Sequence, residues 1–377
     1  MLRIGIVAGE SSGDQLGAEL ITELKALEPA VEIHGMCGPK MREAGCITLA
    51  DIESLSVMGL VEVLRKYPQL RRLRNELLKR LLALDLDIFV GIDVPDFVHY
   101  LEKELKSAGV KTVHLVAPQV WAWRSGRAKR LRDMVDLLLV LFPFEPAFFT
   151  RYGVNTRFVG HPLVRKIADP VDRRAACEAL DVSDETRYIA LMPGSRKQEI
   201  RRHSELFCQV AFELAGSFPS HHFLIGAVNT DAAEEIEKVL AALDLRERVR
   251  VIVGKSHQVL AAADGALLVS GTVTMEALVS KTPMVVAIRI AGLSYQILRR
   301  MVKVPFVAMP NVLAGKEIVP EFVQDEATID NLAGALKKCL SDQAWRSEFR
   351  DNAEKLRQSL IPEDKNVAAR AVLDLVG

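Results

Sequence analysis

The stretch ALLVSGTVTMEAL, residues 266–278, has the pattern of a buried strand, a two-residue turn and the start of a helix. Its first four residues are apolar, and Ser270 and Gly271 interrupt the run. Thr272 is predicted to cap the helix, with Glu276 one turn further in. The free N–H groups of a helix start favour a phosphate, whereas a carboxylate suits neutral hydroxyls such as those of a ribose. The stretch predicts either a nucleoside diphosphate site or an ordinary strand–helix junction with a solvated Glu276.

Length and composition indicate a globular chain of two domains. The chain has 377 residues, of which 49% are hydrophobic and 26% charged, and one core rarely organises so many. Lys+Arg and Asp+Glu both number 49, so we expect no nucleic-acid partner. The five cysteines have no metal-binding spacing, which favours a reduced, cytoplasmic compartment without a metal or cofactor. Because the sequence shows neither a signal peptide nor a membrane span, we expect any membrane contact to be peripheral.

The first predicted strand, residues 2–8, runs into a turn that contains Gly9, Glu10, Ser12 and Gly13. Doubly wound α/β folds bind ligands at this first strand–helix turn. The turn is not G-x-G-x-x-G, which disfavours a dinucleotide. The glycines either let a ligand approach the backbone closely or serve chain geometry alone.

Further strands are predicted at residues 31–36, 87–92, 110–116, 136–142 and 156–159. Asp93 follows the third strand, and catalytic carboxylates of open α/β sheets lie at the carboxyl ends of strands. Asp93 is therefore a candidate general base. Asp96 is expected to cap a helix from Phe97, and a metal site from these two carboxylates is disfavoured because no further ligands lie nearby.

Residues 57–80 form an unusual basic and apolar segment with a helical pattern. It carries seven basic residues against two acidic ones. Such a helix can bind an anionic membrane surface or hold a lipid chain, and the alternative is a sheet-covering helix with a solvated basic face. The residues expected to face the membrane are Val57, Met58, Leu60, Val61, Val63 and Leu64.

A second series of strands is predicted at residues 188–192, 223–227, 249–253, 266–269 and 284–288. The first of these leads into Gly194, Ser195 and Arg196, where Ser195 can cap a helix, its N–H neighbours can hold a phosphate, and Arg196 can clamp a diphosphate. Asn311 follows another apolar run and is predicted to bond a base or phosphate, or to form an Asx turn.

The predicted fold class is α/β, with two Rossmann-like, doubly wound domains facing across a cleft. We expect an N-terminal domain at residues 1–165, a C-terminal domain at 172–345, and helices in 346–377 that cross back onto the first. Asp93 belongs to the first domain and the phosphate and ribose candidates to the second. This layout suits glycosyl transfer from a nucleotide sugar.

Seven motifs, in order along nearly the whole chain, carry a family resemblance. They are VAGESSGD at 7–14, MGLVEVL at 58–64, FVGIDVPDF at 89–97, QVWAWR at 119–124, LMPGSR at 191–196, SGTVTMEAL at 270–278 and MPNVLAG at 309–315. The sequence resembles the lipid A disaccharide synthase family, GT-B glycosyltransferases of Gram-negative bacteria.

The resemblance implies transfer of 2,3-diacylglucosamine from UDP to the 6-hydroxyl of 2,3-diacylglucosamine 1-phosphate (lipid X), giving a β-1,6 disaccharide and UDP. Asp93 would take the proton of the acceptor, with inversion, and Glu10 would lie near the acceptor. Glu276 would hold the ribose, Arg196 and helix-start N–H groups the diphosphate without a metal, and Asn311 matches a nucleotide-site position. Segment 57–80 would face the cytoplasmic side of the inner membrane.

Two other function classes compete with this interpretation. A UDP-N-acetylglucosamine 2-epimerase has the same fold, but it would need several acid/base groups in the cleft and no apolar patch, so residues 57–64 disfavour it. A non-catalytic nucleotide-sugar or lipid-binding module would tolerate Asp93→Asn. Acyl-chain specificity, domain closure and the oligomeric state, a homodimer included, are left open, as is whether Asp93 is the base or only orients the acceptor.

Overall fold

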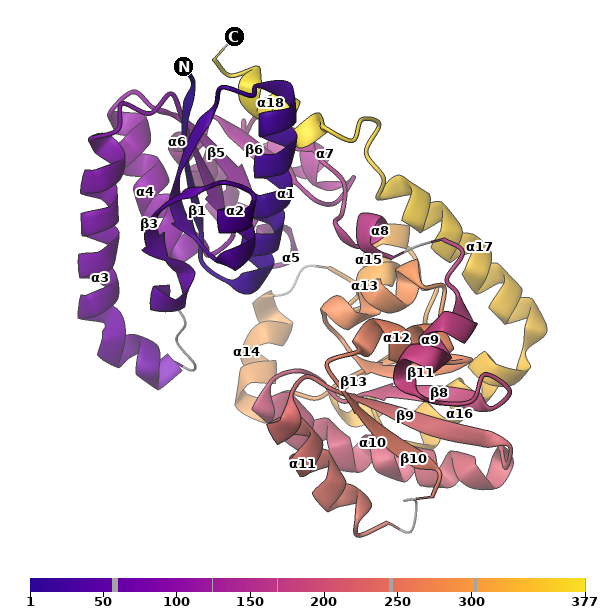
Figure 1. Cartoon of the computed structure of the whole chain (residues 1–377). Coiled ribbons are helices and arrows are strands. Elements are labelled where there is room, and N and C mark those ends of the chain that lie inside the picture. The colour runs from indigo at the N-terminus through magenta and orange to yellow at the C-terminus, as the bar shows by residue number, and fades with distance from the viewer. Residues whose placement is uncertain (56–59, 124, 168, 244–246, 302–303, 377) are drawn as a thin grey trace. The chain divides into compact units, whose positions relative to one another are not determined.

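The computed structural model describes residues 1–55, 60–123, 125–167, 169–243, 247–301 and 304–376. The chain divides into two compact units, one made of Met1–Pro162 with Leu360–Gly377 and the other of Leu163–Ser359 (Figure 1). Each unit has one sheet in which all strand pairs are parallel. The predicted α/β class with two doubly wound sheets is confirmed.

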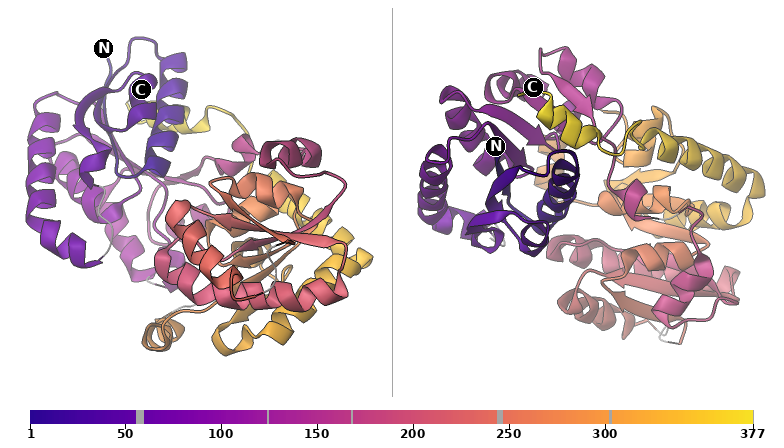
Figure 2. Two further views of the ribbon diagram at one scale, coloured as in Figure 1. Left: turned by 60° about the horizontal axis from the view of Figure 1, so that its bottom comes forward. Right: turned by 45° about the horizontal axis from the view of Figure 1, so that its top comes forward.

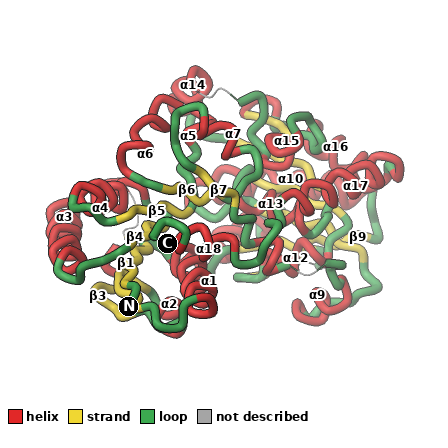
Figure 3. Tube along the Cα trace, turned by 90° about the horizontal axis from the view of Figure 1, so that it is seen from above, coloured by secondary structure: helices red, strands yellow, loops and turns green. Residues whose placement is uncertain are grey.

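Within the described residues of the first unit, seven strands pair in the order β3-β2-β1-β4-β5-β6-β7. They are β1 (Arg3–Ala8), β2 (Glu32–Cys37), β3 (Ile47–Asp51), β4 (Ile88–Ile92), β5 (Lys111–Leu115), β6 (Leu137–Val140) and β7 (Thr156–Phe158). The helices are α1 (Ser11–Leu27), α2 (Pro39–Glu43), α3 (Leu60–Leu82), α4 (Pro95–Ser107), α5 (Val120–Trp123), α6 (Ala128–Met134), α7 (Glu145–Thr150) and α18 (Val367–Leu373). In Figure 3, α3 and α4 cover one face of the sheet and α1 and α18 the other. The central strands are apolar runs because both faces are covered.

The part of the second unit that the structure describes has six strands in the order β10-β9-β8-β11-β12-β13. They are β8 (Arg187–Met192), β9 (His221–Ala227), β10 (Val249–Val253), β11 (Gly265–Val269), β12 (Met284–Ile288) and β13 (Glu321–Val323). The helices are α8 (Leu163–Lys166), α9 (Arg173–Leu180), α10 (Lys197–Ser217), α11 (Thr230–Leu240), α12 (Ser256–Ala262), α13 (Thr272–Val279), α14 (Gly292–Met301), α15 (Met309–Ala314), α16 (Ile329–Ser341) and α17 (Gln343–Ser359). Figure 1 shows α10, α11 and α16 on one face, with α9, α12 and α13 on the other.

The C-terminal segment differs from the predicted division at residue 346. Helix α17 packs against α13, α15 and α16 within the second unit, where it buries Phe349 and Ala353. The chain joins the first unit only from Leu360, whose carbonyl accepts a hydrogen bond from His161 N at 3.0 Å. Helix α18 then packs beside α1 (Figure 2). Helix α17 therefore belongs to the second unit, and only the residues after it belong to the first.

The basic segment 57–80 is described only in part. Val57 and Met58 lie outside the described residues, as do the side chains of Leu60, Val61, Val63 and Leu64. In the remainder of α3, Leu77 and Leu81 are buried against the sheet while Lys79 and Arg80 are exposed. This part is thus a sheet-covering helix with a solvated basic face. Among the described helices, none has the length and apolar character that crossing a membrane requires.

Candidate functional site

A cavity of about 370 Å³ lies in the second unit where β8, β9 and β11 end. Met192, Ala227 and Val269, the last residues of these strands, all line it. Open α/β sheets bind ligands at this edge. Six of the predicted nucleotide-binding residues line the same cavity: Gly194, Ser195, Ser270, Gly271, Thr272 and Glu276.

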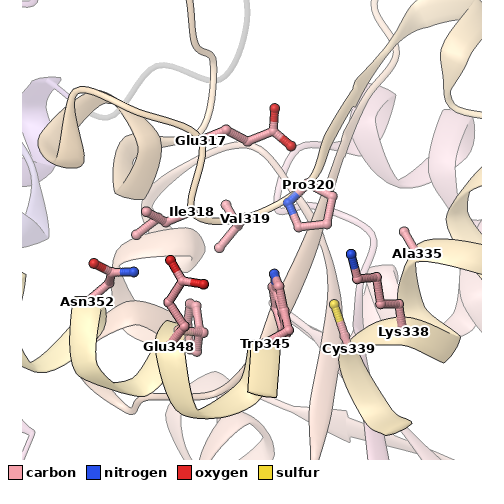
Figure 4. Close-up of a pocket in the computed structure, with 11 residues that line it drawn as sticks. Glu317, Ile318, Val319, Pro320, Ala335, Lys338, Cys339, Trp345, Glu348 and Asn352 are labelled. Carbon is pink, nitrogen blue, oxygen red and sulfur yellow. The ribbon is translucent and has the colours of Figure 1, made fainter. Parts of the chain in front are cut away.

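A second cavity in this unit, of about 300 Å³, lies at the amino ends of the strands, opposite the first. It is lined by the loop before β13 and by residues of α16 and α17, including Lys338 and Trp345 (Figure 4). The neighbouring Cys339 Sγ donates to the Met284 carbonyl, where β12 begins. Open α/β sheets bind ligands at the carboxyl ends of their strands, and the second cavity lies at the amino ends. The first cavity is therefore the better ligand site.

The turn after β8 has a geometry that only glycine fits well. Gly194 has φ +119°, and a Cβ there would lie 2.6 Å from Glu199 Cβ. Helix α10 begins at Lys197 with Arg196 as its N-cap, so the prediction that Ser195 caps the helix is wrong. The reason is that Glu199 reaches back from the first turn: its Oε2 accepts from Ser195 N at 3.1 Å and Arg196 N at 3.2 Å.

Glu199 therefore occupies the N–H groups that were predicted to hold a phosphate. Its Oε1 also accepts a hydrogen bond from Arg196 Nη1 at 2.9 Å, although the Arg196 side chain is 84% exposed. A phosphate at this turn would compete with the Glu199 carboxylate for the same donors. The same exchange would release the Arg196 guanidinium for a bidentate contact.

The turn after β11 leaves its helix start without a side-chain cap. Helix α13 begins at Thr272, and its N-cap is Gly271, whose backbone is extended (φ 164°). The prediction that Thr272 caps the helix is wrong, because this threonine is already the first helical residue. The Ser270 hydroxyl donates to the Val307 carbonyl at 2.7 Å and fixes the turn. Further in, the Ser256 hydroxyl donates to Glu276 Oε2 at 2.7 Å, which orients that carboxylate at the cavity wall.

Asn311 has a different place from the predicted one. It is fully buried, and its Nδ2 donates to the Val319 carbonyl at 2.9 Å and to Glu321 Oε2 at 3.1 Å. Its Oδ1 accepts from the N–H groups of Ile318 at 2.8 Å and Val319 at 3.0 Å. The amide is used within the fold and holds α15 to the segment before β13. In this conformation it offers no donor or acceptor to a nucleotide.

In the first unit, Asp93 follows β4 directly and is partly buried. Both Asp93 (φ +52°) and Val94 (φ +45°) are left-handed, which is costly for a β-branched residue and is typical of functional turns. A Cβ at Gly9 would lie 2.5 Å from Val94 Cγ2, so the turns after β1 and β4 touch. Glu10 is the exposed N-cap of α1. The structure thus brings the Glu10 and Asp93 turns together at one edge of the sheet.

Other residues near this edge have structural roles. Asp14 is 3% exposed and accepts hydrogen bonds from the N–H groups of Gly38, Lys40 and Met41, so it caps α2. Helix α4 begins at Pro95, which leaves Asp96 exposed in its first turn and not at the predicted cap.

The remaining predicted residues of the first turn differ in burial. Ser12 is exposed, and Gly13 is buried, where a Cβ would meet Ala8 Cβ at 3.3 Å. Gly13 therefore permits the close packing of α1 on the end of β1.

The described residues contain one group whose side chains could ligate a metal, namely His99, Glu102 and His114. Their ligand atoms lie within 4.8 Å of one another. His114 pairs with Gly91, near the carboxyl end of β4. No periodic pattern in the sequence marks this group, because His99 and Glu102 lie on a helix and His114 on a strand.

Comparisons with known proteins identify the family of this chain. The sequence model of the family described as Lipid-A-disaccharide synthetase (LpxB) matches residues 4–375. The chain is 44% identical over 375 residues to the lipid-A-disaccharide synthase of Pseudomonas paraeruginosa strain PA7, covering 100% of this chain and 98% of that one.

Two solved structures share the fold at low sequence identity. The kitacinnamycin glycosyltransferase has a TM-score of 0.63 at 17% identity and covers 100% of this chain and 99% of its own. A putative UDP-N-acetylglucosamine 2-epimerase from Listeria monocytogenes has a TM-score of 0.63 at 14% identity, with coverage of 100% and 95%. Because transferases and an epimerase share this GT-B fold, the sequence match, and not the fold, separates the two activities.

Proposed function

Because this chain belongs to the lipid-A-disaccharide synthase family and is a glycosyltransferase, we propose that it transfers 2,3-diacylglucosamine from UDP to the 6-hydroxyl of 2,3-diacylglucosamine 1-phosphate. The products are the β-1,6 disaccharide 1-phosphate and UDP. The observation that carries the proposal is the 370 Å³ cavity, which gathers two strand–helix turns and Glu276 at one edge of the second sheet.

In this proposal the cavity holds UDP. The N–H groups at Gly271 and Thr272 bind the diphosphate, since the α13 start has no carboxylate cap. Arg196 leaves Glu199 and clamps the diphosphate as negative charge develops on the leaving group. Glu276, held by Ser256, accepts hydrogen bonds from the ribose hydroxyls. No metal ion is required for this charge stabilisation.

The acceptor belongs to the first unit in this proposal. Asp93 takes the proton of the 6-hydroxyl while that oxygen attacks the anomeric carbon and the bond from this carbon to the UDP oxygen breaks. A single displacement of this kind inverts the anomeric configuration. Glu10, whose turn touches that of Asp93, orients the acceptor and is the second candidate for the base.

The proposed substrates carry acyl chains that are held in a membrane, so the enzyme must bind at the membrane surface. We propose that segment 57–80 binds the anionic cytoplasmic face of the inner membrane, through its apolar residues and basic side chains such as Arg71 and Arg72, which are exposed. Cosedimentation with anionic vesicles tests this: charge reversal at Arg71 and Arg72 should weaken binding, and equal binding to neutral vesicles would contradict it.

The proposed reaction is tested by product formation from the two lipids, with UDP binding measured beside it. Asp93→Asn should lose turnover by at least about 10²-fold while it retains UDP binding. The matched control is Asp96→Asn, because Asp96 is the exposed carboxylate three residues on and should tolerate the change.

Each other outcome has a defined meaning. Full turnover by Asp93→Asn, with loss in Glu10→Gln, would move the base to Glu10. UDP binding without any disaccharide from wild-type protein would refute the acceptor, and acceptor-independent isomerisation of UDP-N-acetylglucosamine would refute the transfer reaction.

A further inference from the structure

A buried ionisable pair lies behind the Asp93 turn and has no part in the proposed reaction so far. Glu102 on α4 and His114 on β5 are both 0% exposed, and His114 Nδ1 lies 2.6 Å from Glu102 Oε1. His99, one turn before Glu102, packs against His114 with 4.8 Å between the ring centroids and the ring planes tilted by 54°. Two charged groups rarely occupy a core unless they serve a purpose, because apolar side chains of the same size stabilise it at least as well.

The backbone of β4 is adapted to this pair. His114 pairs in register with Gly91, two residues before Asp93. A Cβ at Gly91 would lie 2.4 Å from Glu102 Oε1 and 2.1 Å from Val98 Cγ1. Only glycine therefore lets the Glu102 carboxylate pass the strand and reach His114.

The separation of the two atoms is that of a direct hydrogen bond and not that of two ligands on one metal ion. A zinc ion with bonds of about 2.0–2.2 Å keeps its ligand atoms about 3 Å or more apart and takes four ligands. The 2.6 Å distance is that of a charge-assisted hydrogen bond. The pKa of His114 is raised: burial lowers it, but the charge and hydrogen bond of Glu102 and the charge of Asp93 outweigh burial. His99 stays neutral, since burial lowers its pKa to about 3.

The pair is joined to Asp93 through strained backbone. Asp93 N donates to the Leu115 carbonyl at 3.0 Å, and Leu115 follows His114 directly. Asp93, Val94 and Val116 all have positive φ, at +52°, +45° and +79°. Such conformations persist only where the surrounding structure holds them.

We propose that Glu102 and His114 are positioning residues for Asp93. Their bond pins α4 to β5 next to the strained residues Asp93, Val94 and Val116. The pair thereby holds the Asp93 turn in one conformation and fixes the direction of the carboxylate. This inference rests on the proposed role of Asp93.

The test compares kcat, KM and UDP affinity of Glu102→Gln and His114→Asn with those of His99→Leu. The first two variants should lower kcat by roughly ten- to a hundred-fold, because a misplaced base is costly. Their KM and UDP affinity should stay within about two-fold, since the pair contacts neither substrate and UDP binds the other unit in the proposed reaction. His99→Leu should leave kcat, KM and UDP affinity unchanged, because His99 takes no part in the bond between Glu102 and His114.

A variant with both Glu102→Met and His114→Leu separates positioning from stability. An apolar pair of similar size should fold as well as wild type, yet show the same loss of kcat at unchanged UDP affinity. Wild-type kcat in any folded variant that lacks the pair would overturn the proposal. So would unfolding of the double variant, because the pair would then be a requirement of stability alone. If Asp93→Asn is inactive while these variants are normal, only this inference fails; if Asp93→Asn is active, the proposed base fails as well.

Discussion

Replacement of Asn311 by alanine should destabilise the second unit strongly without removing a nucleotide contact. The change deprives the N–H groups of Ile318 and Val319 and the carbonyl of Val319 of their partner, in a place where Asn311 itself is 0% exposed. Each buried backbone group left unsatisfied costs about 1–3 kcal/mol, and water entering the space recovers a part, so we expect a loss of about 3–5 kcal/mol. Such a loss is a large share of the roughly 5–15 kcal/mol that stabilises a typical domain.

The assay is backbone hydrogen exchange in the second unit at rising urea concentrations, which does not require the two units to unfold together. The matched control is Asn331→Ala. Asn331 is exposed in the first turn of α16, and its Nδ2 donates to the Glu326 carbonyl, so its loss should cost no more than about 0.5 kcal/mol. UDP affinity is measured on both variants under conditions where they are folded. If Asn311→Ala is as stable as the control but binds UDP tenfold more weakly, the structural role is refuted and the predicted nucleotide contact is right.

Three further predictions follow from buried or capping carboxylates. Burial raises the pKa of Glu145 to about 7, so between about pH 4.5 and 7 the folded state holds a proton that the unfolded state releases. The first unit should therefore lose up to about 3 kcal/mol of unfolding free energy as the pH rises through this range. Urea titrations at several pH values should show this slope in wild type and not in Glu145→Gln. Asp14→Ala should cost about 2–3 kcal/mol by freeing three N–H groups, measured by the same exchange assay on the first unit. Glu199→Gln should tighten UDP binding by roughly five-fold in calorimetry, since a competing charge at the turn is removed; weaker binding would contradict the competition.

The sequence predicts well the central strands, whose two faces are both covered by helices. Strands β4, β8 and β11 are short apolar runs because parallel strands are buried on both sides. Of the four strands at the sheet edges, the sequence predicts β7 and β10 but not β3 and β13. The residues of β3 and β13 are partly exposed, and neither strand forms a clear apolar run, so both are defined by pairing with a neighbour, which a single sequence does not show.

The candidate site shows the same limit at the level of single side chains. The glycine turns and Glu276 could be predicted because their pattern is local. The carboxylate–histidine pair could not, since Glu102 has the spacing of a helix residue and its partner lies on a separate strand. Asn311 is predicted from the sequence to bond a base or phosphate or to form an Asx turn, but its partners lie seven to ten residues further along and enclose it. Long-range hydrogen bonds, and not residue type, decide whether such a group faces a ligand.

The two turns that line the cavity are alike in sequence but unequal as anion sites. At the start of α10, Glu199 already satisfies two N–H groups and places a negative charge beside them. At the start of α13, the N-cap is Gly271, which has no side chain with which to compete. A diphosphate that meets both turns gains most at α13, because there it replaces only solvent. At α10 it must first displace a carboxylate, and the compensation is the freed Arg196 guanidinium. In the proposed reaction, the α10 turn would therefore contribute chiefly when the phosphate charge is largest, which is when the sugar has left.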